Sequence, residues 1–141
     1  MKKLIVFILT LATAQAYAVQ HPETADVELK KHFPQASDIQ WKKADDSLIE
    51  ARFISNDQEM SAFFTSTGSF VEADTEVSFE ELPTIIKALS AYYVEKSHCY
   101  YVKSIDSNNH VVYSMYFQNN NHQYQVLMEE GKTTSVLKEL K

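Results

Sequence analysis

Histidine side chains are the residues of this sequence with the greatest potential for metal binding and proton transfer. The five histidines are His21, His32, His98, His110 and His122. No two of them have the i, i+4 spacing of a helical zinc site, and a single cysteine cannot form a Cys-x-x-Cys motif. His110 and His122 could approach each other across a hairpin, but no carboxylate or third ligand is in register with them. We therefore expect neither a metal site nor a cofactor.

Other catalytic signatures are also missing from the sequence. Its two glycines, Gly68 and Gly131, stand at turns and form no phosphate loop or nucleophile elbow. The acidic clusters are Asp45-Asp46, Glu72-Ala73-Asp74, Glu80-Glu81 and Glu129-Glu130. None of them has the spacing of a calcium-binding loop, so we interpret them as turn residues, strand-edge charges and a helix N-terminus. The pattern favours a protein that is not an enzyme.

Cys99 is the only cysteine, so the chain cannot form an internal disulfide. Its neighbours His98, Tyr100 and Tyr101 provide no basic cluster that would favour the thiolate. We expect a buried, inert thiol at the start of a strand. Pairing between chains, or a reactive thiol, is the alternative.

The N-terminus has the organisation of a secretory signal. A basic start at Lys2 and Lys3 precedes an apolar run over residues 4–11 and then small residues. We expect a signal peptide over residues 1–18, cleaved after Ala18 or, as second choice, after Ala16. A buried N-terminal helix or strand is the alternative. The run is shorter than the roughly 20 residues of a membrane span. There is no cysteine near the expected cleavage site, so we do not expect a lipid anchor. The pattern indicates a periplasmic or secreted protein.

Length and charge limit the remaining possibilities. The chain has 141 residues, with 13 basic and 19 acidic side chains and a net charge of −6. Residues 19–141 are enough for one domain with a hydrophobic core. No further apolar run is long enough to span a membrane. A nucleic-acid-binding protein needs a basic stripe, and none is present, so we expect no nucleic-acid partner.

Turn-forming residues occur in two similar sets. The first set is Asp45-Asp46, Asn56-Asp57 and Thr67-Gly68, and the second is Asn108-Asn109, Asn120-Asn121 and Gly131-Lys132. Strand-like stretches separate the turns, and a helical segment precedes each set. The sequence thus predicts an α+β fold of two tandem pseudo-repeats, about 19–77 and 78–141. Each would consist of an N-terminal helix followed by an antiparallel four-stranded sheet.

Both expected helices have an apolar stripe. In the first, over residues 25–33, the stripe is Ala25, Leu29 and Phe33, and Pro34 ends the helix. In the second, the stripe is Ile85, Leu89 and Tyr93. Ser78 and Glu81 have the spacing of a capping box, and Pro83 suits a first helical turn.

The turns also predict how the strands pair. A two-residue loop at Asn56-Asp57 pairs Phe53 with Met60, Ala51 with Ala62 and Ile49 with Phe64, and the next turn adds Val71 and Ala73 to that face. A loop at Asn120-Asn121 pairs Phe117 with Tyr124, Met115 with Val126 and Tyr113 with Met128. All these residues are apolar, so we expect the helices to cover this face.

The opposite face combines polar and aromatic residues, a composition typical of binding surfaces. Its candidate partner-binding residues are Arg52, Phe63, Phe70 and Tyr116, and a further candidate is Tyr101, which stands in the second half where the first half has Trp41. Scattered exposed aromatic residues are also common without any function. Trp41 would lie on the open face with a tight turn at Asp45-Asp46, or point inward with one more loop residue. Burial is the better expectation for a lone tryptophan.

Several segments resemble the exported PepSY-like family, also described as beta-lactamase-inhibitor-like. The matching segments are Leu29-Lys30-Lys31-His32-Phe33-Pro34-Gln35-Ala36, Ile39-Gln40-Trp41, Glu50-Ala51-Arg52-Phe53, Glu59-Met60-Ser61-Ala62-Phe63-Phe64 and the link from Thr75 to Pro83. The second half departs from this pattern, with Val94 in place of Pro34. The resemblance implies a two-repeat fold that binds a protein through an open sheet face, and a role in restraining peptidases of the cell envelope. It transfers no individual site residue.

The sequence therefore predicts an exported, non-enzymatic module that binds a protein or peptide through an open sheet face. The alternative is a carrier or sensor of a small ligand, held in an apolar pocket between helices and sheet and lined by Phe53, Phe64, Tyr113 and Phe117. A hydrolase whose polar groups converge only in the folded chain is a third, weaker possibility.

Overall fold

The computed structural model describes residues 20–94 and 99–140. In chain order its elements are α1 (Glu23–His32), β1 (Ser37–Lys43), β2 (Leu48–Ser55), β3 (Gln58–Thr65), β4 (Phe70–Val77), the 3-10 turn η1 (Phe79–Glu81), α2 (Thr84–Val94), β5 (Cys99–Asp106), β6 (Val111–Asn119), β7 (His122–Glu129) and β8 (Ser135–Leu140). The expected signal peptide and His98 lie outside the described residues.

The two central hairpins have the register that the sequence predicts. Asn56 and Asp57 adopt φ of 50° and 62°, and Asn120 and Asn121 adopt 49° and 66°. Asparagine and aspartate tolerate this left-handed region, which two-residue hairpin loops require. The predicted pairs from Ile49↔Phe64 to Phe53↔Met60, and from Tyr113↔Met128 to Phe117↔Tyr124, are all present. Local turn chemistry therefore determines which side chains of these four strands face the core.

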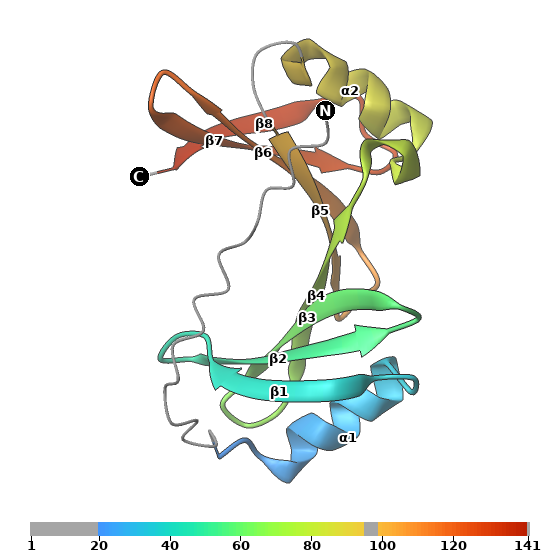
Figure 1. Ribbon diagram of the computed structural model, residues 1–141, viewed down its shortest axis with the longest axis vertical. Helices are drawn as coiled ribbons and strands as arrows, with labels where there is room; N and C mark the ends of the chain where they lie inside the picture. Colours follow the sequence, from blue (N-terminus) through green and yellow to red (C-terminus); the bar gives the residue numbers. More distant parts are fainter. Residues whose placement is uncertain (1–19, 95–98, 141) are drawn as a thin grey trace.

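The expectation of two separate four-stranded sheets is wrong. All eight strands form one antiparallel sheet in the order β1 to β8. Strand β4 pairs with β5 from Glu72↔Asp106 to Val77↔Tyr101, and this ladder joins the halves into the curved sheet of Figure 1. The physical reason is that two separate sheets would each leave an unpaired edge at this point, with its backbone N–H and C=O groups unsatisfied.

Both helices lie on the same face of this sheet, at opposite ends of the molecule (Figure 1). In α1, the fully buried Ala25 and Leu29 pack against Phe64 and its neighbours. Acidic Glu23 and Asp26 in its first turn and basic residues in its last turn complement the helix dipole. The helix ends just before Pro34, as predicted.

The predicted capping box lies one element earlier than expected. Ser78 and Glu81 form it, but it caps η1 rather than α2, which begins at Thr84 after Pro83. The Ser78 backbone N–H donates to Glu81 Oε2 over 2.6 Å, and this hydrogen bond lowers the pKa of that carboxyl. In α2, Ile86 and Ser90 are fully buried and Leu89 nearly so, while Ile85 and Tyr93 are only partly buried against the core. The buried stripe is therefore rotated slightly from the one predicted.

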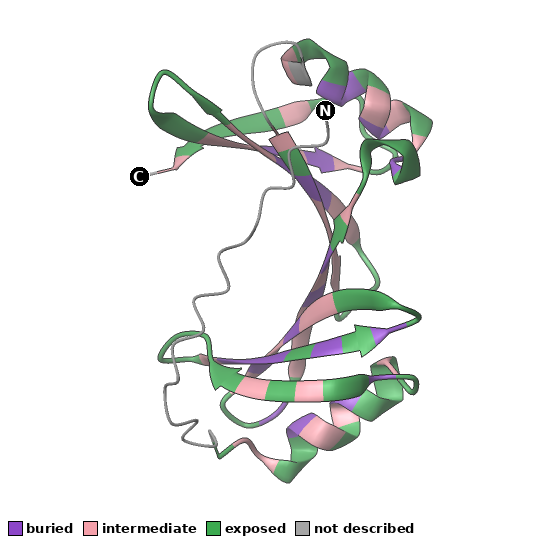
Figure 2. Ribbon diagram, in the orientation of Figure 1, coloured by how far each residue is buried: buried purple, intermediate pink, exposed green. Residues whose placement is uncertain are grey.

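The covered face contains two hydrophobic clusters rather than one. The first joins α1 to β2, β3 and β4 and includes Phe53 and Phe64. The second joins α2 to β5, β6 and β7 and includes Tyr113, with Phe117 at its margin. Figure 2 shows buried residues on the inner strands and on the helix sides that meet the sheet. The edge strands β1 and β8 contain no buried residue (Figure 2).

The two glycines offer a matched test of how the first cluster is closed. Both adopt positive φ, 92° at Gly68 and 84° at Gly131. A Cβ at Gly68 would overlap the Thr24 side chain and lie 2.8 Å from the Ala25 backbone nitrogen, whereas one at Gly131 would meet nothing within 4 Å. The Thr24 hydroxyl also donates to the Thr67 carbonyl oxygen over 2.7 Å, so this turn supports the start of α1.

We predict that Gly68→Ala lowers the free energy of unfolding by roughly 3 kcal/mol, the backbone penalty plus the displacement of α1. Gly131→Ala should lower it by only about 1 kcal/mol, because the backbone penalty acts alone. Denaturant titration of both variants measures the difference. Equal losses would show that the β3–β4 turn does not constrain α1.

Candidate functional site

The uncovered face of the sheet is the candidate site. It is concave and lies between the two helix-bearing halves in Figure 1, and it is called the open face below. Strand pairing assigns to it Gln40, Lys42, Glu50, Arg52, Ser61, Phe63, Glu72, Asp74, Glu76, Tyr100, Val102, Ser104, Asp106, Val112, Ser114, Tyr116, Gln125 and Leu127.

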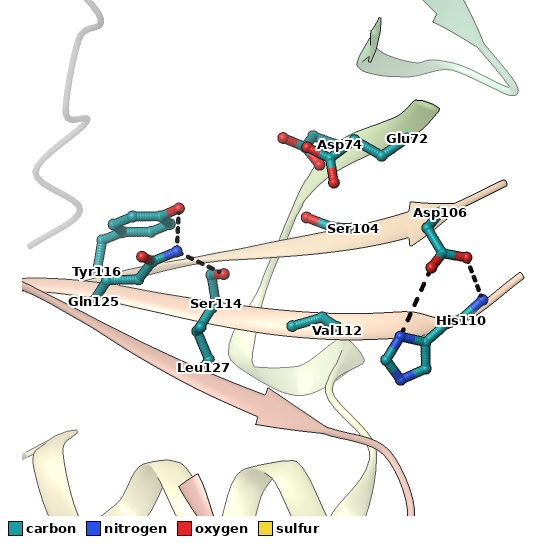
Figure 3. Close-up of a pocket in the computed structure, with 10 residues that line it drawn as sticks. All are labelled: Glu72, Asp74, Ser104, Asp106, His110, Val112, Ser114, Tyr116, Gln125 and Leu127. Carbon is teal, nitrogen blue, oxygen red and sulfur yellow. Dashed lines mark hydrogen bonds and ion pairs between the residues drawn. The ribbon is translucent and has the colours of Figure 1, made fainter. Parts of the chain in front are cut away.

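A hollow of about 280 Å³ lies on this face over β4 to β7 (Figure 3). Its lining residues are Glu72, Asp74, Ser104, Asp106, His110, Val112, Ser114, Tyr116, Gln125 and Leu127. We call it the acidic hollow, because three of these side chains are carboxylic acids and none is lysine or arginine. The β4–β5 ladder creates it by placing Glu72 opposite Asp106 and Asp74 opposite Ser104.

Two carboxyl groups of the acidic hollow resist ionisation. Burial raises the pKa of Glu72, and the nearby charges of Asp74 and Asp106 raise it further. Burial also raises the pKa of Asp74, and Glu50 adds to that effect, while a hydrogen bond with Ser104 opposes it. The Oδ1 atom of Asp74 is buried and has no hydrogen-bond partner among the described residues. The hydrogen bonds and charges around Glu72 and Asp74 therefore do not offset the cost of burying their ionised forms.

Asp106, the third carboxyl group, is held by the β5–β6 turn. Its Oδ1 accepts hydrogen bonds from the backbone N–H groups of Asn108 and His110, at 2.8 and 2.9 Å. These bonds lower its pKa, so Asp106 remains a carboxylate. Figure 3 shows the Asp106–His110 contacts at the rim of the hollow.

His110 and His122 do not meet, because they lie at opposite ends of the β6–β7 hairpin. Nε2 of His110 is 3.2 Å from Glu129 Oε2, while Nδ1 of His122 is 2.5 Å from Glu139 Oε1. Within residues 20–94 and 99–140, no group of three histidine, cysteine or acidic side chains could hold a metal ion.

Glu50 forms a contrasting, fully compensated carboxylate on the same face. It is 6% exposed, and it lies 2.8 Å from Lys42 Nζ, 2.7 Å from Arg52 Nε and 2.9 Å from the Ser61 hydroxyl. Burial opposes its ionisation, but the hydrogen bonds from Arg52, Lys42 and Ser61 outweigh burial and lower its pKa. Each buried charge here has a partner within the protein.

An aromatic pair borders the acidic hollow. The rings of Tyr100 and Tyr116 stack with centroids 4.9 Å apart and planes 14° from parallel. The Gln125 amide donates to the Tyr116 hydroxyl over 2.9 Å and to the Ser114 hydroxyl over 3.1 Å, which fixes the Tyr116 ring (Figure 3). Tyr100 is not among the predicted binding residues, although its alternation with Val102 and Ser104 along β5 is enough to place it on this face.

Of the five predicted partner-binding residues, the open face contains Arg52, Phe63 and Tyr116. Arg52 keeps 57% of its side chain exposed while pairing with Glu50, and Phe63 lies between Glu50 and Glu72 on neighbouring strands. The structure thus brings these three onto one surface. Their role in binding stays a prediction.

The other two predicted residues, Phe70 and Tyr101, lie on the covered face, and their placement on the open face is wrong. A bulge in β4 leaves Val71 unpaired, so Phe70 pairs with Phe64 and packs into the first cluster. Tyr101 is 5% exposed, and burial together with a hydrogen bond to Cys99 raises its pKa to about 12.

Trp41 and Cys99 also lie on the covered face, where they pack against the first and the second cluster respectively. Trp41 pairs with Ala51, stacks on His21 at 4.2 Å and is partly buried against Phe64, so the inward orientation is confirmed. Cys99 begins β5, as predicted, but it is only partly buried, and its Sγ is 3.6 Å from the Tyr101 hydroxyl.

Comparison with known proteins identifies the fold. No protein-family model matches the chain, and no curated protein matches its sequence. Among solved structures, a BLIP-like protein from Bacteroides fragilis is 17% identical with a TM-score of 0.75, over 89% of this chain and 90% of that one. A protein from Bacteroides eggerthii presumed to be periplasmic is 20% identical with a TM-score of 0.71, over 85% and 89%.

A DUF2874 family protein from Bacteroides uniformis is 19% identical with a TM-score of 0.70, over 84% of this chain and 90% of that one. These likenesses establish a BLIP-like fold, and they do not extend to PepSY proteins specifically. Separately, neither helix in the described part of the chain has the length and apolarity needed to cross a membrane.

Asp74 provides a test of the charge balance in the acidic hollow. A carboxyl group whose pKa is raised by folding contributes stability that is fully present below its unfolded pKa, and that contribution is lost as pH rises through the folded pKa. At neutral pH the Asp74 charge therefore opposes folding. We predict that Asp74→Asn raises the free energy of unfolding at pH 7 by about 1 kcal/mol, an ordinary size for a point substitution.

The gain should disappear below about pH 3, where the aspartate is mostly protonated in both states. Chemical denaturation at several pH values measures it. Asp46→Asn, at a fully exposed position, is the control and should change stability by less than about 0.5 kcal/mol. A loss of stability in Asp74→Asn at pH 7 would contradict the assignment.

Proposed function

We propose that this protein is an exported, non-enzymatic module that binds a protein or peptide partner through its open face. The observation that carries the proposal is the asymmetry of the sheet. Both helices cover one face, and the other is a concave surface with a hollow. It also has several aromatic residues that are partly exposed. Surfaces that combine shape, aromatic side chains and arginine are typical of binding patches.

Export is supported by two independent observations. Residues 1–18 have the basic, apolar and small-residue order of a cleaved signal peptide, and one structural neighbour is presumed to be periplasmic. We therefore place residues 19–141 in the periplasm or outside the cell as the functional domain.

A binding role is favoured by the BLIP-like fold and by the chemistry of the open face. The likeness to the BLIP-like protein agrees with the beta-lactamase-inhibitor-like resemblance of the sequence. In the acidic hollow, His110 contacts the carboxylates of Asp106 and Glu129 rather than a serine or cysteine that it could activate. The further step, that the partner is a peptidase, rests on the PepSY-like sequence resemblance alone.

The alternative of a small-ligand carrier loses its main support. That hypothesis requires one pocket lined by four aromatic residues. In the structure, Phe53 and Phe64 belong to the first cluster, whereas Tyr113 and Phe117 belong to the second. Three of these side chains are less than a tenth exposed within packed clusters. One apolar pocket shared by all four is therefore excluded by their separation.

Site-specific photo-crosslinking tests the proposed face. A photo-reactive phenylalanine analogue at Phe63 should crosslink a partner in cell-envelope extract, because this side chain is on the open face. The same analogue at Val27, which is 66% exposed on α1, is the control and should not. Crosslinking to the same partner from both positions, or from Val27 alone, would refute the open face as the binding surface.

Substitution should then weaken the captured complex. We predict that Arg52→Ala combined with Phe63→Ala reduces affinity for that partner at least tenfold, about 1.4 kcal/mol. The matched variant Lys31→Ala with Val27→Ala removes similar side chains from α1, where Lys31 is 68% exposed, and should leave affinity unchanged. Calorimetry or surface binding measures both. Equal affinities for the two variants would contradict the proposal.

A further inference from the structure

We infer that the acidic hollow receives an arginine side chain of the partner, held by Glu72 and Asp74. This inference rests on the proposed function and adds the chemistry of the partner at the centre of the interface. The occupant is thus a basic segment of a protein or peptide, with a guanidinium group as its anchor.

The first argument is the distribution of cations on the open face. Glu50 is paired with Lys42 and Arg52, whereas the lining of the acidic hollow provides no lysine or arginine for Glu72 or Asp74. Asp106 is already engaged by the backbone of its own turn. Glu72 and Asp74, on the same face of β4, are therefore available to a positive charge of the partner. Specific interfaces generally place charges of opposite sign against each other.

The second argument is the cost that these groups impose in the free protein. Glu72 and Asp74 are on the same face of one strand, both are partly buried, and Asp74 Oδ1 has no hydrogen-bond partner in the described structure. Burial raises the pKa of each, and nearby carboxylates add to it: Asp74 and Asp106 act on Glu72, and Glu50 acts on Asp74. Residues that oppose folding in this way occur characteristically at functional sites, and a cation in the hollow would relieve the repulsion.

The third argument is the shape of the site, which favours arginine over lysine. The hollow of about 280 Å³ is lined by Glu72 and Asp74, which lie two residues apart on the same face of β4. A guanidinium group is planar and directs several N–H donors to carboxylates at once. A lysine ammonium would satisfy the charge, but it lacks the planar set of donors that can bridge two carboxylates.

Selection from a displayed library of random peptides tests the inference on the folded protein. We expect the enriched peptides to contain arginine and to bind at least tenfold more weakly to the variant Glu72→Gln with Asp74→Asn. The control variant Glu80→Gln with Glu130→Gln removes two negative charges at exposed positions away from the hollow and should bind normally. Both variants replace side chains by near-isosteric amides, and circular dichroism verifies that they fold.

Citrulline, a neutral isostere of arginine, separates charge from shape. Replacing the arginine of a selected peptide by citrulline should weaken binding at least tenfold, and replacing it by lysine at least threefold. Binding that depends on Arg52 and Phe63 but needs no arginine, or that survives the Glu72→Gln and Asp74→Asn variant, would overturn the inference and leave the proposed function standing. Selected peptides that ignore the open face altogether would overturn both.

Discussion

The pairing of β4 with β5 is the interaction on which the rest of this structure depends. Its hydrogen bonds turn two sets of four strands into one sheet and place both helices on the same side of it. The opposite side is left uncovered and concave. The same ladder aligns Glu72 with Asp106 and Asp74 with Ser104, so the polar centre of the open face exists only because these two strands meet.

Local features of the fold could be predicted from the sequence, whereas the joining of its halves could not. Asn56-Asp57 and Asn120-Asn121 determine the register of their hairpins through backbone conformation, which is a property of neighbouring residues. Pairing of β4 with β5 connects segments separated by η1 and α2, and no residue pattern specifies which edge meets which. The bulge at Val71 also has no recognisable residue pattern in the sequence. Because of this bulge, Phe70 lies on the covered face instead of the predicted open face.

The same distinction applies to the candidate site. Alternation along β2, β3 and β6 correctly places Arg52, Phe63 and Tyr116 on the open face. Glu72 and Asp74, by contrast, belong to the acidic clusters that the sequence pattern assigns to turns, strand edges and a helix N-terminus. Pairing with β5 moves β4 from an edge to the middle of the sheet, and the two carboxylates become partly buried. Their chemistry was visible in the sequence, but their environment depended on a long-range contact.

The separation of the two hydrophobic clusters has a mechanical consequence. The two halves share a backbone ladder rather than a common core, so the twist between β4 and β5 sets the angle at which the halves face each other. That angle determines the width of the concave face and the spacing between Arg52 on one side and Tyr116 on the other. The width of the open face is therefore set at the β4–β5 ladder. A substitution in that ladder could widen or narrow the face without contacting Arg52 or Tyr116.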